Sequence, residues 1–469
     1  MKRLISWLLL AILLTLTTTS CGPGTPPTPE ETELLQEGNE MPRTQLQTKQ
    51  SGELEDNRIG IMFCDLWHPQ WEAFPDGVLD AGHILSEGVK RVRFAINHLD
   101  YQSVQWGQFE SSIDPSHDEF ITSLADNGIT MTFVLTFWDM EYHTAGADEI
   151  TIPRFKTEDE IQRYLDYVRF IVNHFKDRVE YYEIWNEPNN EGMPQSIEVE
   201  DYINLVKRTV PVIREEYPEA KIVVGGVAYL RQQDAYNYLL AIISSDEIIP
   251  LVDVISWHAM YGTSPEHEFH RDYYYEYPSI VQEIKDIAST HGFSGEYVAD
   301  ELSWMTLGCP VTNPLQVTYS ETKSAKYYAR GILMNLGMDV AVSQFYHVPG
   351  EHPLQIVNTI RNICTIMAGT EPIASPVEIE SEADNIASYA FSLPNGDKLL
   401  ALWVDGIATD GNPSIAATLT LPDFSAQKVI AIDVLNGIEQ ELITSTDDED
   451  LVISNLLVKD YPIILRLTP

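Results

Sequence analysis

The chain has 469 residues, 44% of them hydrophobic, so it is long enough for one large domain and a smaller one. Its 29 basic residues stand against 71 acidic ones, which gives a formal net charge of −42. Such a charge excludes electrostatic binding to nucleic acid or anionic membranes, and it should repel polyuronates and sulfated glycans. A neutral ligand is therefore favoured by elimination.

The N-terminus has the pattern of an export signal. Lys2 and Arg3 precede an apolar run, 4–16, that is too short to span a bilayer as a mature helix. Cys21 resembles the lipidated cysteine of a bacterial lipobox, although Thr18 stands where leucine is usual. We expect residues 1–21 to direct export and Cys21 to carry a lipid anchor, which makes the protein a cell-surface or periplasmic lipoprotein. Plain secretion is the alternative, and no other membrane contact is expected.

The next segment, 22–56, is rich in proline and then in scattered acids, which predicts a disordered tether. Three cysteines follow Cys21, at positions 64, 309 and 364. Their odd number and the lack of CxxC spacing argue against a disulfide framework or a zinc site. Buried free thiols are expected, with one bridge through Cys309 as the alternative.

Residues 57–371 alternate short apolar runs with amphipathic stretches. The eight runs are 59–63, 92–96, 130–137, 179–185, 221–227, 252–257, 297–299 and 340–345. Helical patterns lie near 114–127, 161–175, 197–217, 232–245, 271–291, 318–337 and 352–368. Eight strand–helix units predict an α/β fold, a (β/α)8 TIM barrel. A doubly wound open sheet is the alternative, but no glycine-rich phosphate loop follows the first run.

The pattern changes in residues 372–469. Apolar runs alternate there with Asn-Gly and Asp-Gly pairs, which favour tight hairpins; the runs are 386–391, 399–404, 416–421, 429–433 and 461–467. We expect an all-β sandwich that packs against the barrel. Sugar binding by this domain is the alternative role.

Two glutamates mark the chemistry. Glu187 lies in Trp-Asn-Glu-Pro at the end of the fourth run, and Glu301 directly follows the seventh. Active sites of TIM barrels lie at the carboxyl ends of the strands. Retaining hydrolysis of a glycosidic bond uses two carboxyl groups about 5–5.5 Å apart, one as acid/base and one as nucleophile. At that spacing, repulsion of roughly 3 kcal/mol should raise the pKa of the acid by about 2.

The residues 182–189, Tyr-Glu-Ile-Trp-Asn-Glu-Pro-Asn, resemble the strand-four motif of clan A glycoside hydrolases, which include cellulases, mannanases and β-xylosidases. The resemblance implies a retaining barrel with the acid/base on strand four and the nucleophile on strand seven. Glu187 would then be the acid/base, Glu301 the nucleophile and Asn186 the ligand of the sugar 2-hydroxyl.

Weaker matches extend the resemblance. Arg93 on strand two resembles the arginine beneath the nucleophile in this clan, and His258 with Tyr261 resembles its His-then-Tyr signature on strand six, where the tyrosine donates to the nucleophile. The sequence departs from the pattern around Glu301, because Asp300 stands where threonine or serine is usual. Strand alternation should aim only one of these two acids at the cleft, so Asp300 remains a rival nucleophile.

Other polar groups have structural interpretations. Glu183 lies on the same strand face as Glu187, and we expect it to pair with Arg91 or Arg93. Histidines near strand ends, His98, His258 and His347, raise the question of a metal site. Because no HxH follows the first run and no HExxH occurs, no metal and no cofactor is expected.

Tryptophans lie at or just beyond five strand ends, at positions 67, 138, 185, 257 and 304. Indole faces stack on the apolar C–H faces of sugars. Trp304 and Trp138 are the predicted substrate-binding tryptophans, with Trp304 as the main platform.

The sequence thus predicts an exported retaining β-glycosidase acting on a neutral polysaccharide or oligosaccharide. The sugar, the linkage, exo or endo action and the oligomeric state stay open. The competing hypothesis is a surface lipoprotein that binds glycans with a non-catalytic barrel.

Overall fold

The structure is a computed structural model that describes residues 34–63, 80–95, 113, 115–137, 153–191, 195–306, 317–345 and 354–469. These residues belong to one compact unit, Leu34–Pro469. The expected export signal, Cys21 and the first part of the tether lie outside them. No helix in the described ranges is both long and apolar enough to cross a membrane.

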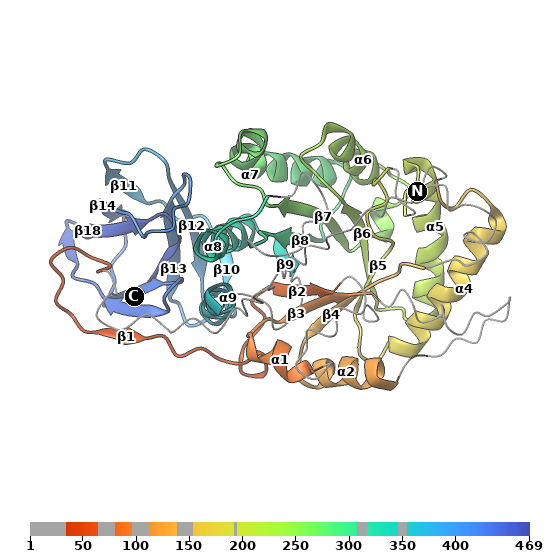
Figure 1. Cartoon of the computed structure of the whole chain (residues 1–469), viewed down its shortest axis with the longest axis horizontal. Coiled ribbons are helices and arrows are strands. Elements are labelled where there is room, and N and C mark those ends of the chain that lie inside the picture. Colours follow the sequence, from red (N-terminus) through yellow and green to blue (C-terminus); the bar gives the residue numbers. More distant parts are fainter. Residues whose placement is uncertain are drawn as a thin grey trace, which may run out of the picture. The chain divides into compact units, whose positions relative to one another are not determined.

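In the described part of the chain, eight parallel strands close into a barrel (Figure 1). They follow chain order, and β2 pairs with β9 to complete the ring. Each predicted run overlaps one barrel strand, so the predicted TIM barrel is confirmed. The strands are β2 (Ile59–Phe63), β3 (Arg91–Phe94), β4 (Thr130–Val134), β5 (Tyr181–Glu183), β6 (Lys221–Val227), β7 (Val254–Tyr261), β8 (Glu296–Ser303) and β9 (Ala341–Phe345).

Helices surround this barrel (Figure 1). They are α1 (Ala81–Ser86), α2 (Pro115–Asp126), α4 (Glu158–Phe175), α5 (Val199–Glu216), α6 (Gln233–Ile243), α7 (Glu268–Thr290), α8 (Glu321–Gly337) and α9 (Leu354–Ile366), with short 3-10 turns η2 (Ser51–Glu53) and η5 (Ile249–Leu251). Helix α4 shows how the sequence sets them. The Thr157 side chain caps its first turn by accepting from the backbone N–H of Glu160, and its apolar face, which includes Ile161 and Val168, is buried.

The C-terminal residues form the predicted antiparallel sandwich. Within the described residues, one sheet has the order β1-β16-β15-β19-β13-β12-β10 and the other β11-β14-β18-β17. The strands are β1 (Arg43–Gln45), β10 (Glu371–Ile373), β11 (Glu378–Ser381), β12 (Ile386–Ser392), β13 (Lys398–Val404), β14 (Ser414–Leu421), β15 (Lys428–Asp433), β16 (Ile438–Glu441), β17 (Ser445–Asp447), β18 (Asp450–Lys459) and β19 (Ile463–Thr468).

The prediction of a disordered tether over 22–56 has to be corrected for residues 34–56. Strand β1 pairs with β16, Leu35 is fully buried, and Asn39 donates to the carbonyl of Glu441 at 2.8 Å. This packing could not be predicted from the polar composition of the segment. The segment contributes one edge strand and a few anchoring side chains, and it has no periodic apolar pattern.

Helix α8 joins the barrel to the sandwich through buried cations. Lys326 Nζ lies 2.6 Å from Asp460 Oδ1, and Arg330 Nη1 donates to the carbonyl of Gly406 at 2.5 Å. Neither cation is exposed, so both charges depend on these partners. The sandwich therefore packs directly on the barrel, as expected from the sequence.

Candidate active site

Glu187 lies in a tight turn beyond the carboxyl end of β5. Trp185 and Glu187 have φ values of 71° and 48°, which non-glycine residues rarely adopt. The turn is fixed by neighbouring β6, since the backbone N–H of Glu187 donates to the carbonyl of Gly226 at 3.0 Å. Gly226 itself has a φ of +51°, and a Cβ there would lie 2.7 Å from Glu183 Oε1. The backbone thus turns Glu187 toward the centre of the barrel mouth.

Two amides hold the Glu187 carboxylate from its own loop. Its Oε2 accepts from Asn190 Nδ2 at 2.9 Å and from Gln195 Nε2 at 3.2 Å. The loop is anchored by Trp185, whose Nε1 donates to the carbonyl of Gln195 at 2.7 Å. Trp185 is therefore a structural anchor.

Glu301 reaches the site because β8 is irregular there. Its pairing with β7 runs Trp257 to Ala299 and then His258 to Glu301, so Asp300 is passed over. Asp300 points into the barrel interior, and the bulge turns the next residue inward as well. A bulge, rather than regular alternation, thus sets these two acids apart: Glu301 lies at the barrel mouth, and Asp300 lies deeper in the barrel.

Arg93 on β3 connects the acids of the barrel mouth. Its guanidinium donates to Glu301 Oε1 at 2.9 Å and makes two bonds to Glu183, at 2.7 and 2.9 Å. It also donates to Asn186 Oδ1 at 2.8 Å, which orients that amide. Of the two predicted partners for Glu183, Arg93 is the one observed.

His258 lies between the two candidate catalytic acids. Its Nδ1 is 3.1 Å from Glu187 Oε1 and 2.7 Å from the Tyr261 hydroxyl, and its Nε2 is 3.4 Å from Glu301 Oε1. The Tyr261 hydroxyl donates to Glu301 Oε2 through a short hydrogen bond. The structure thus brings together Glu187, Glu301, His258, Tyr261, Arg93 and Asn186.

The nearest ligand atoms of Glu187, His258 and Glu301 lie within 4.8 Å of one another. The two carboxyl groups therefore fall in the shorter class of spacing, about 5–5.5 Å, used by retaining glycosidases, rather than the roughly 6.5–9.5 Å of inverting ones. Among the described residues this trio is the one group that could hold a metal ion. A metal needs neutral histidine, and here the adjacent Arg93 already balances the acids, so we interpret the trio as acid–base machinery.

The charges of the site perturb its titration. Burial lowers the pKa of His258, but the carboxylates of Glu301, Asp300 and Glu187 outweigh it and raise that pKa to about 9. Burial raises the pKa of Glu187, yet the hydrogen bond and charge of His258, with the two amides, leave it below its usual value. The sequence-based expectation of a raised acid pKa is therefore corrected, because it omitted the cation between the two carboxylates.

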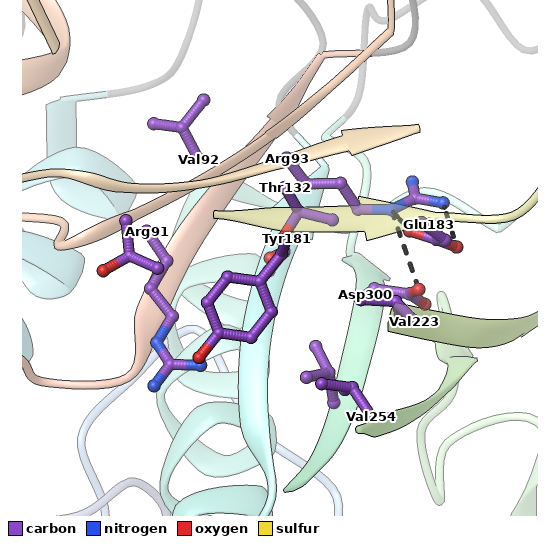
Figure 2. Close-up of a pocket in the computed structure, with 12 residues that line it drawn as sticks. Arg91, Val92, Arg93, Thr132, Tyr181, Glu183, Val223, Val254 and Asp300 are labelled. Atoms are coloured by element: carbon purple, nitrogen blue, oxygen red, sulfur yellow. Dashed lines mark hydrogen bonds and ion pairs between the residues drawn. The ribbon is translucent and has the colours of Figure 1, made fainter. Parts of the chain in front are cut away.

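A small cavity lies inside the barrel, directly beneath Arg93, Glu183 and Asp300 (Figure 2). Its volume is about 20 Å³. Such a volume admits about one water molecule and no sugar. Neither Glu187 nor Glu301 lines this cavity, so it is distinct from the space between those two acids.

The tryptophans predicted to bind substrate are Trp304 and Trp138. Trp304 is 1% exposed, its Nε1 donates to the carbonyl of Thr263 at 2.7 Å, and its ring packs on Gly331 of α8. It cannot serve as a sugar platform, because β8 turns its side chain outward into the layer of helices. Trp257 is also buried, whereas Trp138 and Trp67 lie outside the described residues.

Sequence reasoning missed Tyr229, which follows β6. Its half-buried ring lies 5.7 Å from the ring of Tyr261, and its φ of 53° is unusual for a bulky residue. Two amide–backbone bonds between Asn189 and Ala228 hold this segment against the Glu187 loop. No motif marks the residue, since only the tertiary contact places it beside the site.

Comparison with known proteins supports the same fold. No known family profile matches the sequence. A family 39 glycoside hydrolase from Bacteroides cellulosilyticus WH2 is 15% identical, with a TM-score of 0.61 over 89% of this chain and 82% of that one. A glucosidase from Croceicoccus marinus is 14% identical, with a TM-score of 0.54 over 90% and 96%.

The catalytic domain of GH30 xylanase C from Talaromyces cellulolyticus is 11% identical, with a TM-score of 0.55 over 91% of this chain and 98% of that one. The barrel and sandwich therefore have the fold of clan A glycoside hydrolases, as the strand-four motif predicted. At 11–15% sequence identity, this similarity shows that the chain shares the fold of glycoside hydrolases.

Proposed function

We propose that this protein is a retaining β-glycosidase that cleaves a neutral glycan or oligosaccharide through a covalent glycosyl-enzyme. The observation that carries the proposal is the pair Glu187 and Glu301, which come from the ends of strands β5 and β8 and whose nearest oxygens lie within 4.8 Å of each other. The carbohydrate hydrolases with the same fold support a sugar substrate. The net charge of −42 favours a neutral one.

In the first step, a Glu301 oxygen attacks the anomeric carbon, the bond to the leaving oxygen breaks, and Glu187 gives that oxygen a proton. The Glu187–His258 pair holds this proton, because His258 Nδ1 lies 3.1 Å from Glu187 Oε1. Arg93 and Tyr261 hold Glu301 for attack. Asn186, whose oxygen is fixed by Arg93, presents its Nδ2 to the 2-hydroxyl of the sugar.

In the second step, Glu187 takes a proton from water, the water oxygen bonds to the anomeric carbon, and the ester bond to Glu301 breaks. The carboxylate state of Glu187 favoured by His258 suits this base role. Arg93 and Tyr261 then stabilise the carboxylate released on Glu301.

The test is turnover of a panel of aryl β-glycosides and neutral oligosaccharides, with product configuration followed by NMR. A product of retained β configuration is expected. An inverted anomer would refute the retaining mechanism. Binding without turnover over a broad panel would instead identify a glycan-binding lipoprotein.

The proposal extends to location. The signal-like residues 1–20 and the lipobox-like Cys21 support an exported lipoprotein that meets glycans outside the cytoplasm.

A further inference from the structure

Asp300 is a buried acid that the proposed reaction does not use. It is 1% exposed, and within the described residues neither of its carboxylate oxygens has a hydrogen-bond partner. An ionised carboxylate in such a place is costly unless a cation lies near it. The cations near Asp300 should therefore indicate its role.

Two cations lie at the same distance from Asp300. Its Oδ1 is 3.6 Å from His258 Nε2, and its Oδ2 is 3.6 Å from Arg93 Nε. The bulge in β8 produces this position, since it lets Asp300 stay inside the barrel while Glu301 rises to the mouth. Figure 2 shows the carboxylate beneath the Arg93 side chain.

Arg93 and His258 differ in how many other hydrogen-bond partners balance their positive charge. Arg93 makes hydrogen bonds to Glu183, Glu301 and Asn186. His258 Nε2 has no hydrogen-bond partner among the described residues and faces only the carboxylates of Asp300 and Glu301. The charge of Asp300 is thus one of two acidic charges at this imidazole nitrogen, whereas the guanidinium already has three hydrogen-bonded partners.

Among the described residues, acids and one tyrosine face the two nitrogens of His258. Glu187 and Tyr261 lie at Nδ1, and Asp300 and Glu301 lie at Nε2, with Arg93 behind the two acids. Glu301 loses its charge when it becomes an ester, so Asp300 is then the acid left at Nε2. Burial and the charge of Glu183, against Arg93 and His258, raise the pKa of Asp300 to about 7, so its charge responds near neutrality.

We propose that Asp300 is a positioning residue whose carboxylate, 3.6 Å from His258 Nε2, holds His258 in the protonated form from which Glu187 receives its proton. The link to Glu187 rests on the proposed glycosidase function. The link between Asp300 and His258 does not, because it is a property of the folded protein alone. The proposal also gives Asp300 a role other than nucleophile.

The experiment is an NMR titration of 13C-labelled histidine side chains in the full folded chain, with the His258 resonance assigned by its loss in His258→Gln. In Asp300→Asn the pKa of His258 should fall by about 1–3 pH units, as expected when an opposite charge at this distance is removed. Asp300→Ser provides a second uncharged variant in case the amide disturbs folding. Glu296→Gln removes an acid from the far end of β8 and should leave the His258 pKa unchanged.

The pH dependence of turnover is the second measurement. If His258 stores the proton, the alkaline limb of kcat/KM in Asp300→Asn should move to lower pH by the same amount as the NMR pKa. An unchanged His258 pKa in both Asp300 variants overturns the proposal, even if they lose stability or activity. Absence of turnover in the wild type refutes the proposed function alone, since the NMR titration still decides the role of Asp300.

Discussion

At the scale of single residues, the candidate site is one connected set of charges. Arg93 bonds Glu183 and Glu301, and His258 lies between Glu301 and Glu187. Each of these acids therefore lies within hydrogen-bond or ion-pair distance of a cation.

Glu187→Gln should lower kcat by about 10²–10⁴ on substrates with sugar leaving groups, because it removes the general acid. The loss should be much smaller for dinitrophenyl glycosides, whose leaving group needs no proton. Steady-state kinetics on both substrate types measure the difference. Glu191→Gln, an exposed acid of the same loop, is the matched control and should behave as wild type. Equal losses on both substrates would contradict the acid role.

Glu301→Gly should be inactive on its own and recover turnover with azide, which enters the space of the missing carboxylate. The product should be a glycosyl azide of inverted configuration, identified by NMR. Asp300→Gly should show no such rescue, because its carboxylate lies inside the barrel. Rescue of the Asp300 variant instead would exchange the two assignments.

The charge of His258 also links the site to stability. A pKa raised from 6.5 to about 9 corresponds to roughly 3 kcal/mol of stabilisation. The sign follows from the raised value: the contribution is complete below about pH 6.5 and is lost as pH rises through about 9. Urea unfolding of wild type and His258→Gln should therefore show a difference that shrinks over this range. A difference independent of pH would show that His258 is not charged in the folded protein.

At the scale of elements, two departures from regular structure build the site. The turn after β5 uses positive φ values at Trp185 and Glu187, and the bulge in β8 brings Asp300 and Glu301 to the same side. With regular alternation along β8, either Asp300 or Glu301 would have pointed away from the barrel interior. The chemistry therefore depends on local irregularities that a periodic pattern cannot reveal.

The segment before the barrel is a further element that the sequence pattern did not predict. Leu35 is fully buried, while its neighbour Leu34 is 40% exposed. Leu35→Ala should lower the free energy of unfolding by about 2–5 kcal/mol, since it leaves a cavity in the sandwich core. Leu34→Ala is the matched control, with an expected change within about 0.5 kcal/mol. Chemical denaturation measures both, and equal effects would contradict the observed packing of this segment.

At the scale of the whole molecule, the proposed location outside the cytoplasm rests on the signal-like N-terminus and the lipobox-like Cys21. Lipidation at Cys21 would hold a chain with net charge −42 at a membrane that it does not bind electrostatically. In a bacterial host, Cys21→Ser should move the protein from the membrane fraction to the soluble exported fraction and abolish incorporation of labelled palmitate. Membrane association that survives the substitution would refute the lipid anchor.

Much of this molecule followed from the sequence because the signals were local. The eight apolar runs gave the barrel strands, and Asn-Gly and Asp-Gly pairs separated the strands of the sandwich. Trp-Asn-Glu-Pro at the end of one run and Glu301 after another indicated the two acids, since TIM-barrel chemistry lies at strand ends. Each of these inferences needs only the residues within a few positions of one another.

The burial and the protonation of the site residues depend on residues far apart in the chain, so only the tertiary structure determined them. The sequence predicted Trp304 as a sugar platform, but it is a core residue, because its ring packs on Gly331 of α8. The lowered pKa of Glu187 comes from a histidine 71 positions away, and the buried place of Asp300 comes from a bulge against β7. Burial and charge act through space, so the protonation of this site is a property of the closed barrel rather than of any segment of the sequence.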